Sequence, residues 1–246
     1  MLGAMNSEAK FSVPPLLSLL LGLTVLNELF VLVIVLRYSY NRLTLVASAV
    51  GAIILLALSI FLWRYNQQTS RQGRHPVVSQ ASAVGAVLGG LWIVEISINN
   101  FIAPPLPARD RIDDSIWAFI ALTIFAFACL YAYRLASVKA GMLVGAWSGL
   151  VSGVFACWMA LALVVFGMHF ITHDPLNLAE WAARSKTNQP TTMAAYFAYE
   201  TFAGAFLHLI VLGLLMGALL GVIGGILGKG SKIIIRWLQQ SEQVKM

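Results

Sequence analysis

The chain has 246 residues, of which 59% are hydrophobic and only 11% are charged. Charged residues make up about a quarter of a typical soluble domain, so this composition excludes a soluble globular protein. The length suits one bundle of several membrane-spanning helices without a second large domain. The net charge of +6 comes from basic residues between apolar runs, where they set topology and contact anionic headgroups. We therefore expect a lipid bilayer, and no nucleic acid, as the partner.

Six apolar runs reach the roughly 20 residues that a membrane-spanning helix needs. They predict an all-α membrane bundle of six helices that forms a single domain over residues 1–246. The first run is too long for the apolar part of a signal peptide, so we interpret it as a span. The fifth is long for a span, which predicts a tilted helix or one that projects from the bilayer. The predicted spans are 15–36, 43–63, 81–103, 116–135, 141–171 and 203–228.

Lysine and arginine residues predict that both termini face the cytoplasm. With the N-terminus inside, ten basic residues fall on the inner side and six on the outer side. Such an excess is the usual mark of the cytoplasmic face, and the pair Arg37 and Arg42 is the exception. We therefore expect a multi-pass protein of a cell membrane, such as the bacterial inner membrane.

Two polar connections carry patterns of their own. Asp174 followed by Pro175 is typical of a helix start, which predicts a short helix over 174–186 on the outer surface. Basic and apolar faces alternate over 231–240, which predicts a second short helix lying on the inner surface. Prolines 104, 105 and 107 end the third span, and residues 109–114 are expected to form a mixed-charge outer turn.

Two glycine ladders predict close helix packing. Small residues every four positions let two backbones approach, and such packing drives helix association in lipid. At about 1.5 Å per residue, the two ladders cover the same depth, so we expect the fifth and sixth spans to be the closest pair. Ala81, Gly85 and Gly89 predict a further close contact of the third span. The alternative is that glycine is simply frequent in membrane helices. The ladders are Gly141, Gly145, Gly149 and Gly153, and Gly213, Gly217, Gly221 and Gly225.

A set of polar residues lies inside the predicted spans. Glu28, Glu95, Asn99 and His208, with Asn27 beside the first, all fall in the outer half when depth is counted along the helices. A charge near the bilayer centre costs at least about 2.5 kcal/mol, so intramembrane acids are candidates for a functional site. The sequence predicts a substrate or ion site, linked to protons or cations, at these residues. The alternative is that the two acids only hold helices together through hydrogen bonds.

A second polar set lies nearer the outer rim. His169 and His173 are one helical turn apart, and Glu200 falls at a similar height when depth is counted along the helices. Two histidines at this spacing with a carboxylate can bind Zn²⁺. The pattern lacks the usual protease motif and any cysteine pair, so the alternative is ordinary interfacial histidines. Cys129 and Cys157 lie within apolar runs and are expected to pack as small hydrophobic residues.

Three functions remain open from the sequence. The chain lacks a nucleophile elbow, a phosphate-binding loop, a dinucleotide fingerprint and a paired-cysteine motif, so we expect no cofactor. The polar residues of the outer half favour a permease or transport subunit for a small solute or ion. The absence of catalytic motifs is also compatible with a scaffold, assembly or regulatory subunit that binds a membrane protein or a second copy. The third interpretation is a membrane-embedded metal-dependent enzyme.

Overall fold

The computed structural model describes residues 14–39, 42–72, 76–184 and 192–243, and these contain helices and no strand. The all-α prediction is therefore confirmed. Two stretches are π-helical: η1, which directly continues α3, and η2, which joins α8 to α9. The helices are α1 (Pro14–Tyr38), α2 (Arg42–Gln72), α3 (Pro76–Ser97), η1 (Ile98–Ile102), α4 (Ala108–Leu135), α5 (Val138–Phe166), α6 (Met168–His173), α7 (Pro175–Ala183), α8 (Met193–Phe206), η2 (Leu207–Leu215) and α9 (Met216–Gln243).

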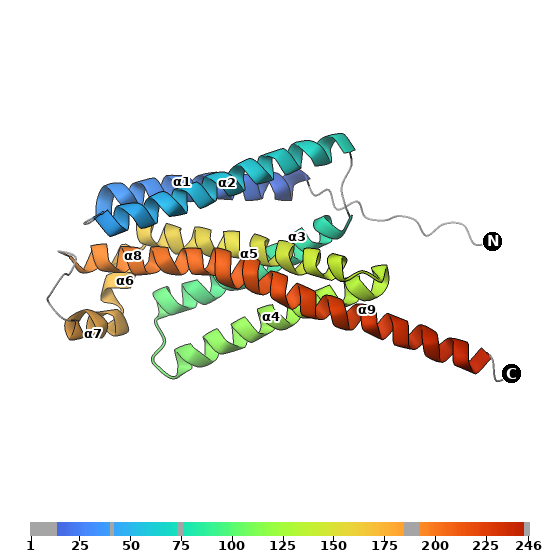
Figure 1. Ribbon diagram of the computed structural model, residues 1–246. Helices are drawn as coiled ribbons and strands as arrows, with labels where there is room; N and C mark the ends of the chain where they lie inside the picture. The colour runs from blue at the N-terminus through green and yellow to red at the C-terminus, as the bar shows by residue number, and fades with distance from the viewer. Residues whose placement is uncertain (1–13, 40–41, 73–75, 185–191, 244–246) are drawn as a thin grey trace, which may run out of the picture.

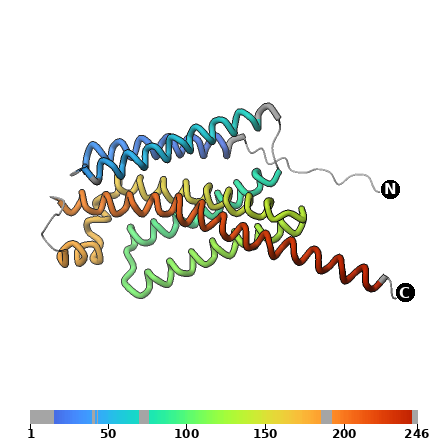
Figure 2. Tube along the Cα trace, in the orientation of Figure 1, coloured from blue at the N-terminus to red at the C-terminus, as the bar shows by residue number. Residues whose placement is uncertain are grey.

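Within the described ranges, six helical stretches are long and apolar enough to cross a membrane. This architecture is compatible with a multi-pass membrane protein. Five of the stretches have 23 to 29 residues. The sixth has 50 residues and is the continuous run of α8, η2 and α9. The first residues of α1 and the last residues of α9 lie at the same end of the bundle (Figures 1 and 2). The helix α7 lies at the other end, here called the α7 end. Which end faces the cytoplasm stays a prediction.

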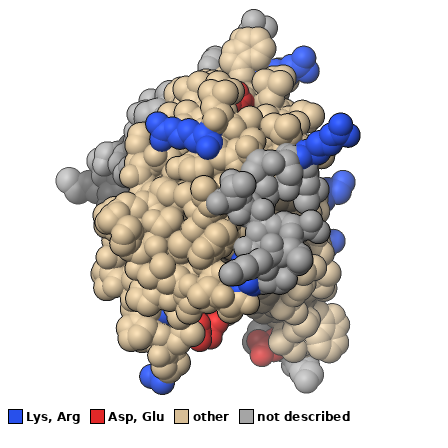
Figure 3. Space-filling view, turned by 90° about the vertical axis from the view of Figure 1, so that its left-hand side faces the viewer, with Lys and Arg blue, Asp and Glu red and all other residues tan. Residues whose placement is uncertain are grey.

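The helices form three layers around α5 (Figure 1). The α1–α2 pair covers one side of α5, α8 to α9 run beside it, and α3 and α4 complete the other side. In the most apolar stretch of α5, 67% of the residues are buried, against 44% or less in the other described spans. The middle position of α5 explains this difference. Seen from the α7 end, most of the described surface carries neither acid nor base (Figure 3).

The two glycine ladders face each other along α5 and the continuous run of η2 and α9. A methyl group on Gly141 would lie 2.6 Å from Cα of Gly225, and one on Gly145 would lie against the carbonyl oxygen of Gly217. One on Gly149 would collide with the carbonyl oxygen of Gly213. The backbones themselves are therefore in contact, with no room for a side chain between them.

Two other helix pairs, α3 with α5 and α4 with α9, pack as extensively as α5 with α9, but α5 also packs along η2, which belongs to the sixth span. That the fifth and sixth spans are the closest pair stays a prediction. On α3, a methyl group at Gly85 would lie 2.6 Å from the Ser148 carbonyl oxygen of α5. On α9, Gly224 would place a methyl group 2.8 Å from the Phe125 carbonyl oxygen, and Gly228 would place one against Cys129 of α4. These two glycines lie outside the predicted ladder, on another face of α9.

The fifth span is shorter than the predicted 141–171, which is a correction. It ends at Phe166, and Gly167 separates it from the short helix α6. The Gly167 amide donates to the Leu163 carbonyl at 2.7 Å, and glycine has the lowest helix propensity of any residue but proline. His169 and His173 therefore lie on α6 and not at the end of the fifth span.

The fourth span also differs, because residues 109–114 form helix and not a turn. The helix α4 begins at Ala108, directly after Pro107, eight residues before the apolar run at 116–135. Asp110 lies in the first turn, where a negative charge interacts favourably with the positive end of the helix dipole. The hydropathy pattern did not predict these first helical turns of α4, because several of their side chains are charged.

The sixth span extends beyond 203–228 at both ends. Thr192 caps α8 by accepting from the Ala195 amide at 3.2 Å, so the helix begins ten residues earlier. At the other end, 231–240 is not a separate helix but continues α9 to Gln243. Ser231 donates to the Leu227 carbonyl at 2.9 Å, a bond made within an unbroken helix.

A short helix does form after Asp174. The Asp174 carboxylate accepts from the Leu176 amide at 2.9 Å, with Pro175 in the first turn of α7, as the sequence pattern predicts. The last two residues of the predicted helix, 185 and 186, lie outside the described residues.

Candidate functional site

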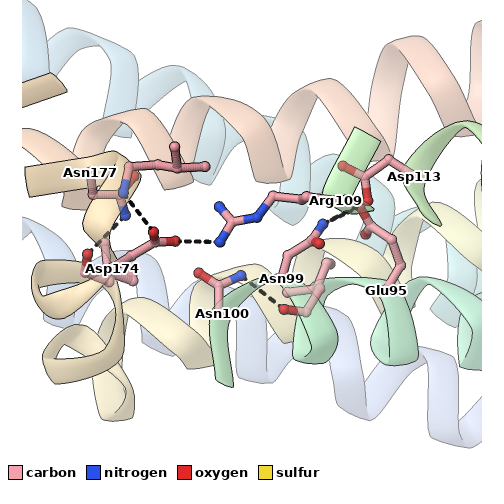
Figure 4. Close-up of polar contacts among 10 residues, drawn as sticks. Glu95, Asn99, Asn100, Arg109, Asp113, Asp174 and Asn177 are labelled. Atoms are coloured by element: carbon pink, nitrogen blue, oxygen red, sulfur yellow. Dashed lines mark hydrogen bonds and ion pairs between the residues drawn. The ribbon is translucent and has the colours of Figure 1, made fainter. Parts of the chain in front are cut away.

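An asparagine joins two carboxyl groups from different helices near the α7 end. The Asn99 side-chain amide donates to Glu95 Oε1 at 2.9 Å and to Asp113 Oδ1 at 2.8 Å. Glu95 belongs to α3, Asn99 to η1 and Asp113 to α4 (Figure 4). Since both bonds share one nitrogen, the two acids face each other across the contact of α3 with α4.

Helical spacing explains how these side chains meet. Glu95 and Asn99 are four residues apart on one helical run, and so are Asp113 and Trp117 on α4. Residues at this spacing share a helix face. Because the chain reverses over 103–107, the first turns of α4 lie beside the last turns of α3 (Figure 1). The Trp117 indole also lies beside the Glu95 carboxyl.

His208 approaches the same cluster from η2. Its ring packs edge-on against Trp92, with centroids 4.7 Å apart, and against Trp117 at 6.0 Å. His208 Nδ1 lies 2.7 Å from the Gly204 carbonyl oxygen, which can only accept, so Nδ1 carries a proton. In a neutral imidazole, Nε2 is then an acceptor.

Three buried atoms of this cluster have no hydrogen-bond partner among the described residues: Glu95 Oε2, Asn99 Oδ1 and His208 Nε2. Leaving a buried polar atom unsatisfied costs about 1–3 kcal/mol. All three can accept a hydrogen bond or coordinate a cation. The arrangement therefore offers acceptors to a positively charged or proton-donating group.

Both π-helical stretches carry a residue of this cluster. Asn99 lies in η1 and His208 lies in η2. A π-helical turn widens the helix by one residue, and such turns occur frequently at functional sites. An apolar cavity of about 270 Å³ adjoins the cluster, and its wall includes Trp92, Trp117 and Met216 of α9.

A buried ion pair lies beside the cluster. Arg109 of α4 donates to Asp174 at 2.9 Å, and only 14% and 3% of the two side chains are exposed. Figure 4 shows Arg109 between Asp174 and the group formed by Glu95, Asn99 and Asp113. Asn177 of α7 also donates to the Ile171 carbonyl at 2.8 Å. The α7 end of the bundle is thus tied to the start of α4.

The fourth predicted residue, Glu28, lies elsewhere. Its carboxylate accepts from Ser59 of α2 at 2.8 Å, within the α1–α2 pair, which is on the other side of α5 from α4 (Figure 1). Asn27 is fully buried, and its side-chain amide has no partner among the described residues. The structure therefore brings together Glu95, Asn99 and His208 but does not join Glu28 to them.

Sequence reasoning missed Asp113, Trp92 and Trp117 as members of the cluster. The sequence patterns single out neither tryptophan as a site residue, and they place Asp113 in the mixed-charge turn expected over 109–114. The four-residue spacing of Asp113 and Trp117 was the pattern that could have revealed them, because it matches that of Glu95 and Asn99.

The residues of the predicted metal site are only partly together. His169 and His173 stack with ring centroids 4.0 Å apart on α6. Glu200 lies on α8, with its carboxylate 3.9 Å from Arg184. No group of three histidine, cysteine, aspartate or glutamate side chains in the described ranges is placed to hold a metal ion.

The fold and the cluster define a class: an all-helical bundle compatible with a multi-pass membrane protein, with paired acids near one end. The chain matches no protein-family model, no curated protein and no solved structure.

Proposed function

We propose that this protein is a permease or transport subunit for a small solute or ion, coupled to protons or cations at Glu95, Asn99, Asp113 and His208. The observation that carries the proposal is the single Asn99 amide nitrogen bound to two carboxyl groups from different helices. Paired acids of this kind can bind a proton or cation, and the binding changes the repulsion between the two helices that carry them.

Electrostatics gives the coupling its physical basis. Two carboxylates this close repel strongly where the surroundings are of low dielectric, so one proton or monovalent cation stabilises the pair. Loss of that charge would push α3 and α4 apart. The unpartnered atoms of Glu95, Asn99 and His208 supply further acceptors for the bound species.

The adjoining cavity suggests where the solute binds. Its volume of about 270 Å³ and its tryptophan-lined wall suit a small, largely apolar or amphipathic molecule. A polar or cationic end of such a molecule would reach the acids past Trp92 and Trp117. Movement of α4 against η2 would then couple proton binding to the cavity.

The test is charge movement in proteoliposomes. The purified protein is reconstituted on a solid-supported membrane, and a panel of amines, amino acids, sugars and inorganic cations is applied with and without a pH gradient. We expect a current that depends on the gradient for at least one class, and a loss of tenfold or more in Glu95→Gln. Glu28→Gln is the matched control and should keep the current, since Glu28 lies in the α1–α2 pair. Equal currents from wild type and Glu95→Gln contradict the proposal, and so does a wild type without current.

A scaffold or regulatory subunit is the second candidate, and one observation favours it. The last turns of α9 project from the bundle (Figure 1), with Ile233, Ile234 and Trp237 each more than half exposed. Such a surface suits a partner protein or the membrane surface. The same experiment separates the candidates, because a scaffold gives no current in wild type. The metal-dependent enzyme is not proposed, since no three His, Cys, Asp or Glu side chains among the described residues are placed together to hold a metal ion.

A further inference from the structure

A long apolar groove lies on the far side of the bundle from the acids. One cavity of about 470 Å³ is bounded by α2 and α8, and a second of about 370 Å³ is bounded by α2, α5 and η2. The two meet at Ile54, which lines both. Cavities of this size are typical of small-molecule sites. The α2 residues along the groove follow helical spacing: Thr44, Ala47, Gly51, Ile54, Leu58 and Phe61.

The groove exists because α2 is held away from the rest of the bundle. Among the described helices, α2 packs its backbone closely against α1 and hardly against α8 or α5. The rings of Phe202 and Phe206 fill the space at Gly51, where a methyl group would lie 2.7 Å from the Phe202 ring. These rings form the floor, and Val50 on the α2 wall is 51% exposed, so the groove is open at the surface of the bundle.

The groove has a polar end and an apolar end. Near the α7 end it is lined by Thr44, Tyr199 and Glu200, and the Tyr199 hydroxyl lies 3.2 Å from the Ser48 hydroxyl. The deeper cavity is lined almost entirely by apolar side chains. Ten residues separate Thr44 from Ile54, which is about 15 Å of helix and matches one half of a hydrocarbon core about 30 Å thick.

We propose that this groove binds one membrane phospholipid, with an acyl chain along α2 toward Ile54 and an amine-bearing headgroup at Glu200. Hydrocarbon is the medium that meets an open apolar groove within a bilayer, and the length of the cavity bounded by α2 and α8 matches one leaflet. Charge selects the headgroup, because Glu200 is the only charged residue among the described residues that line either cavity. Its ion pair with Arg184 is long, at 3.9 Å, and exposed, so it contributes only about 0–1 kcal/mol and leaves the carboxylate available to a lipid ammonium. That carboxylate favours the ammonium of phosphatidylethanolamine over the uncharged glycerol of phosphatidylglycerol.

The proposal does not depend on the transport site. The groove lies along α2 and α8, whereas the acids lie between α3 and α4. Glu200 thereby gains a role that does not require the metal predicted from the sequence.

The test blocks the groove with a tryptophan side chain placed on either of its walls. The protein is reconstituted in vesicles of equal parts phosphatidylethanolamine and phosphatidylglycerol, extracted in detergent, and analysed by native mass spectrometry for retained lipid. Val50→Trp blocks the groove from α2 and Ala203→Trp blocks it from α8. Ile53→Trp is the matched control, because Ile53 is 66% exposed on α2, Val50 is 51% exposed, and only Val50 lines the groove.

We expect both groove variants to retain at least tenfold less phospholipid than wild type, with Ile53→Trp unchanged. Glu200→Gln should keep the amount of bound lipid but lose the preference for phosphatidylethanolamine. Equal retention in the groove variants and in Ile53→Trp overturns the binding site. An unchanged lipid preference in Glu200→Gln overturns the assignment of the headgroup.

Discussion

Asn99 shows how much one side chain can decide in a membrane bundle. Its amide supplies both hydrogens to carboxyl groups, one on its own helix and one on α4. Hydrogen bonds to charged groups contribute about 1.5–3 kcal/mol each, more than bonds between neutral groups. The neighbouring Asn100 donates only to the Ile96 carbonyl of its own helix at 2.8 Å. Two adjacent asparagines therefore have different roles.

Replacing Asn99 by leucine should lower the free energy of unfolding by about 2–4 kcal/mol, because two acids lose their shared donor. Asn100→Leu, the matched control, should cost about 1 kcal/mol or less. Denaturant unfolding in mixed micelles, followed by far-ultraviolet circular dichroism, measures both. If the two variants unfold alike, Asn99 does not hold the acids.

Depth along a helix was enough to find part of the site but not all of it. Glu28 and Glu95 have similar predicted depths, yet the first binds Ser59 and the second faces Asp113. The reason is that depth says nothing about the direction in which a side chain points around the helix axis. Asp113 was missed because its charged turn was assigned to a loop.

At the scale of helices, backbone contact replaces side-chain interdigitation. The hydrophobic effect does not drive helices together in lipid, so close van der Waals packing has to do so. Gly149 touches the Gly213 carbonyl, whereas Gly90 of α3 faces open space with no atom within 4 Å of an added methyl group. The same residue type thus has opposite roles on two helices.

Gly149→Ala should destabilise the protein strongly, since α5 must separate from η2 and α9 to admit a methyl group. Gly90→Ala should leave stability unchanged or raise it by up to about 1 kcal/mol, the difference in helix propensity between the two residues. Thermal melting in detergent compares them. Similar melting temperatures for both variants would show that the ladder contact does not matter for stability.

At the scale of the whole molecule, the Arg109–Asp174 pair links segments that the chain separates by 65 residues. It fastens the start of α4 to the residue that caps α7, at the end of the bundle where the paired acids lie (Figure 4). Breaking one partner of a buried ion pair leaves an uncompensated charge and costs about 3–5 kcal/mol.

Arg109→Gln should release α6 and α7 while the six spans stay folded. We expect amide hydrogen exchange over 168–183 to accelerate by at least tenfold, measured by mass spectrometry. Arg111→Gln serves as the control, because Arg111 lies two residues further along α4 and is exposed, and exposed charges contribute about 0–1 kcal/mol. Unchanged exchange in Arg109→Gln would mean that other contacts hold α7.

The sequence by itself determined that the chain is helical and how many times it can cross a membrane. Lipid offers the backbone no hydrogen-bond partner, so each long apolar run has to satisfy its own amides as a helix. It also marked Glu95, Asn99 and His208, because polar side chains are rare in such runs. Only the tertiary structure decided which helices are neighbours and which acids meet, since that depends on the direction of each side chain around its helix. In the structure, Asp113 lies beside Glu95, Glu28 binds Ser59, and a groove lies beside α2. No residue pattern along a single helix predicts these contacts between helices.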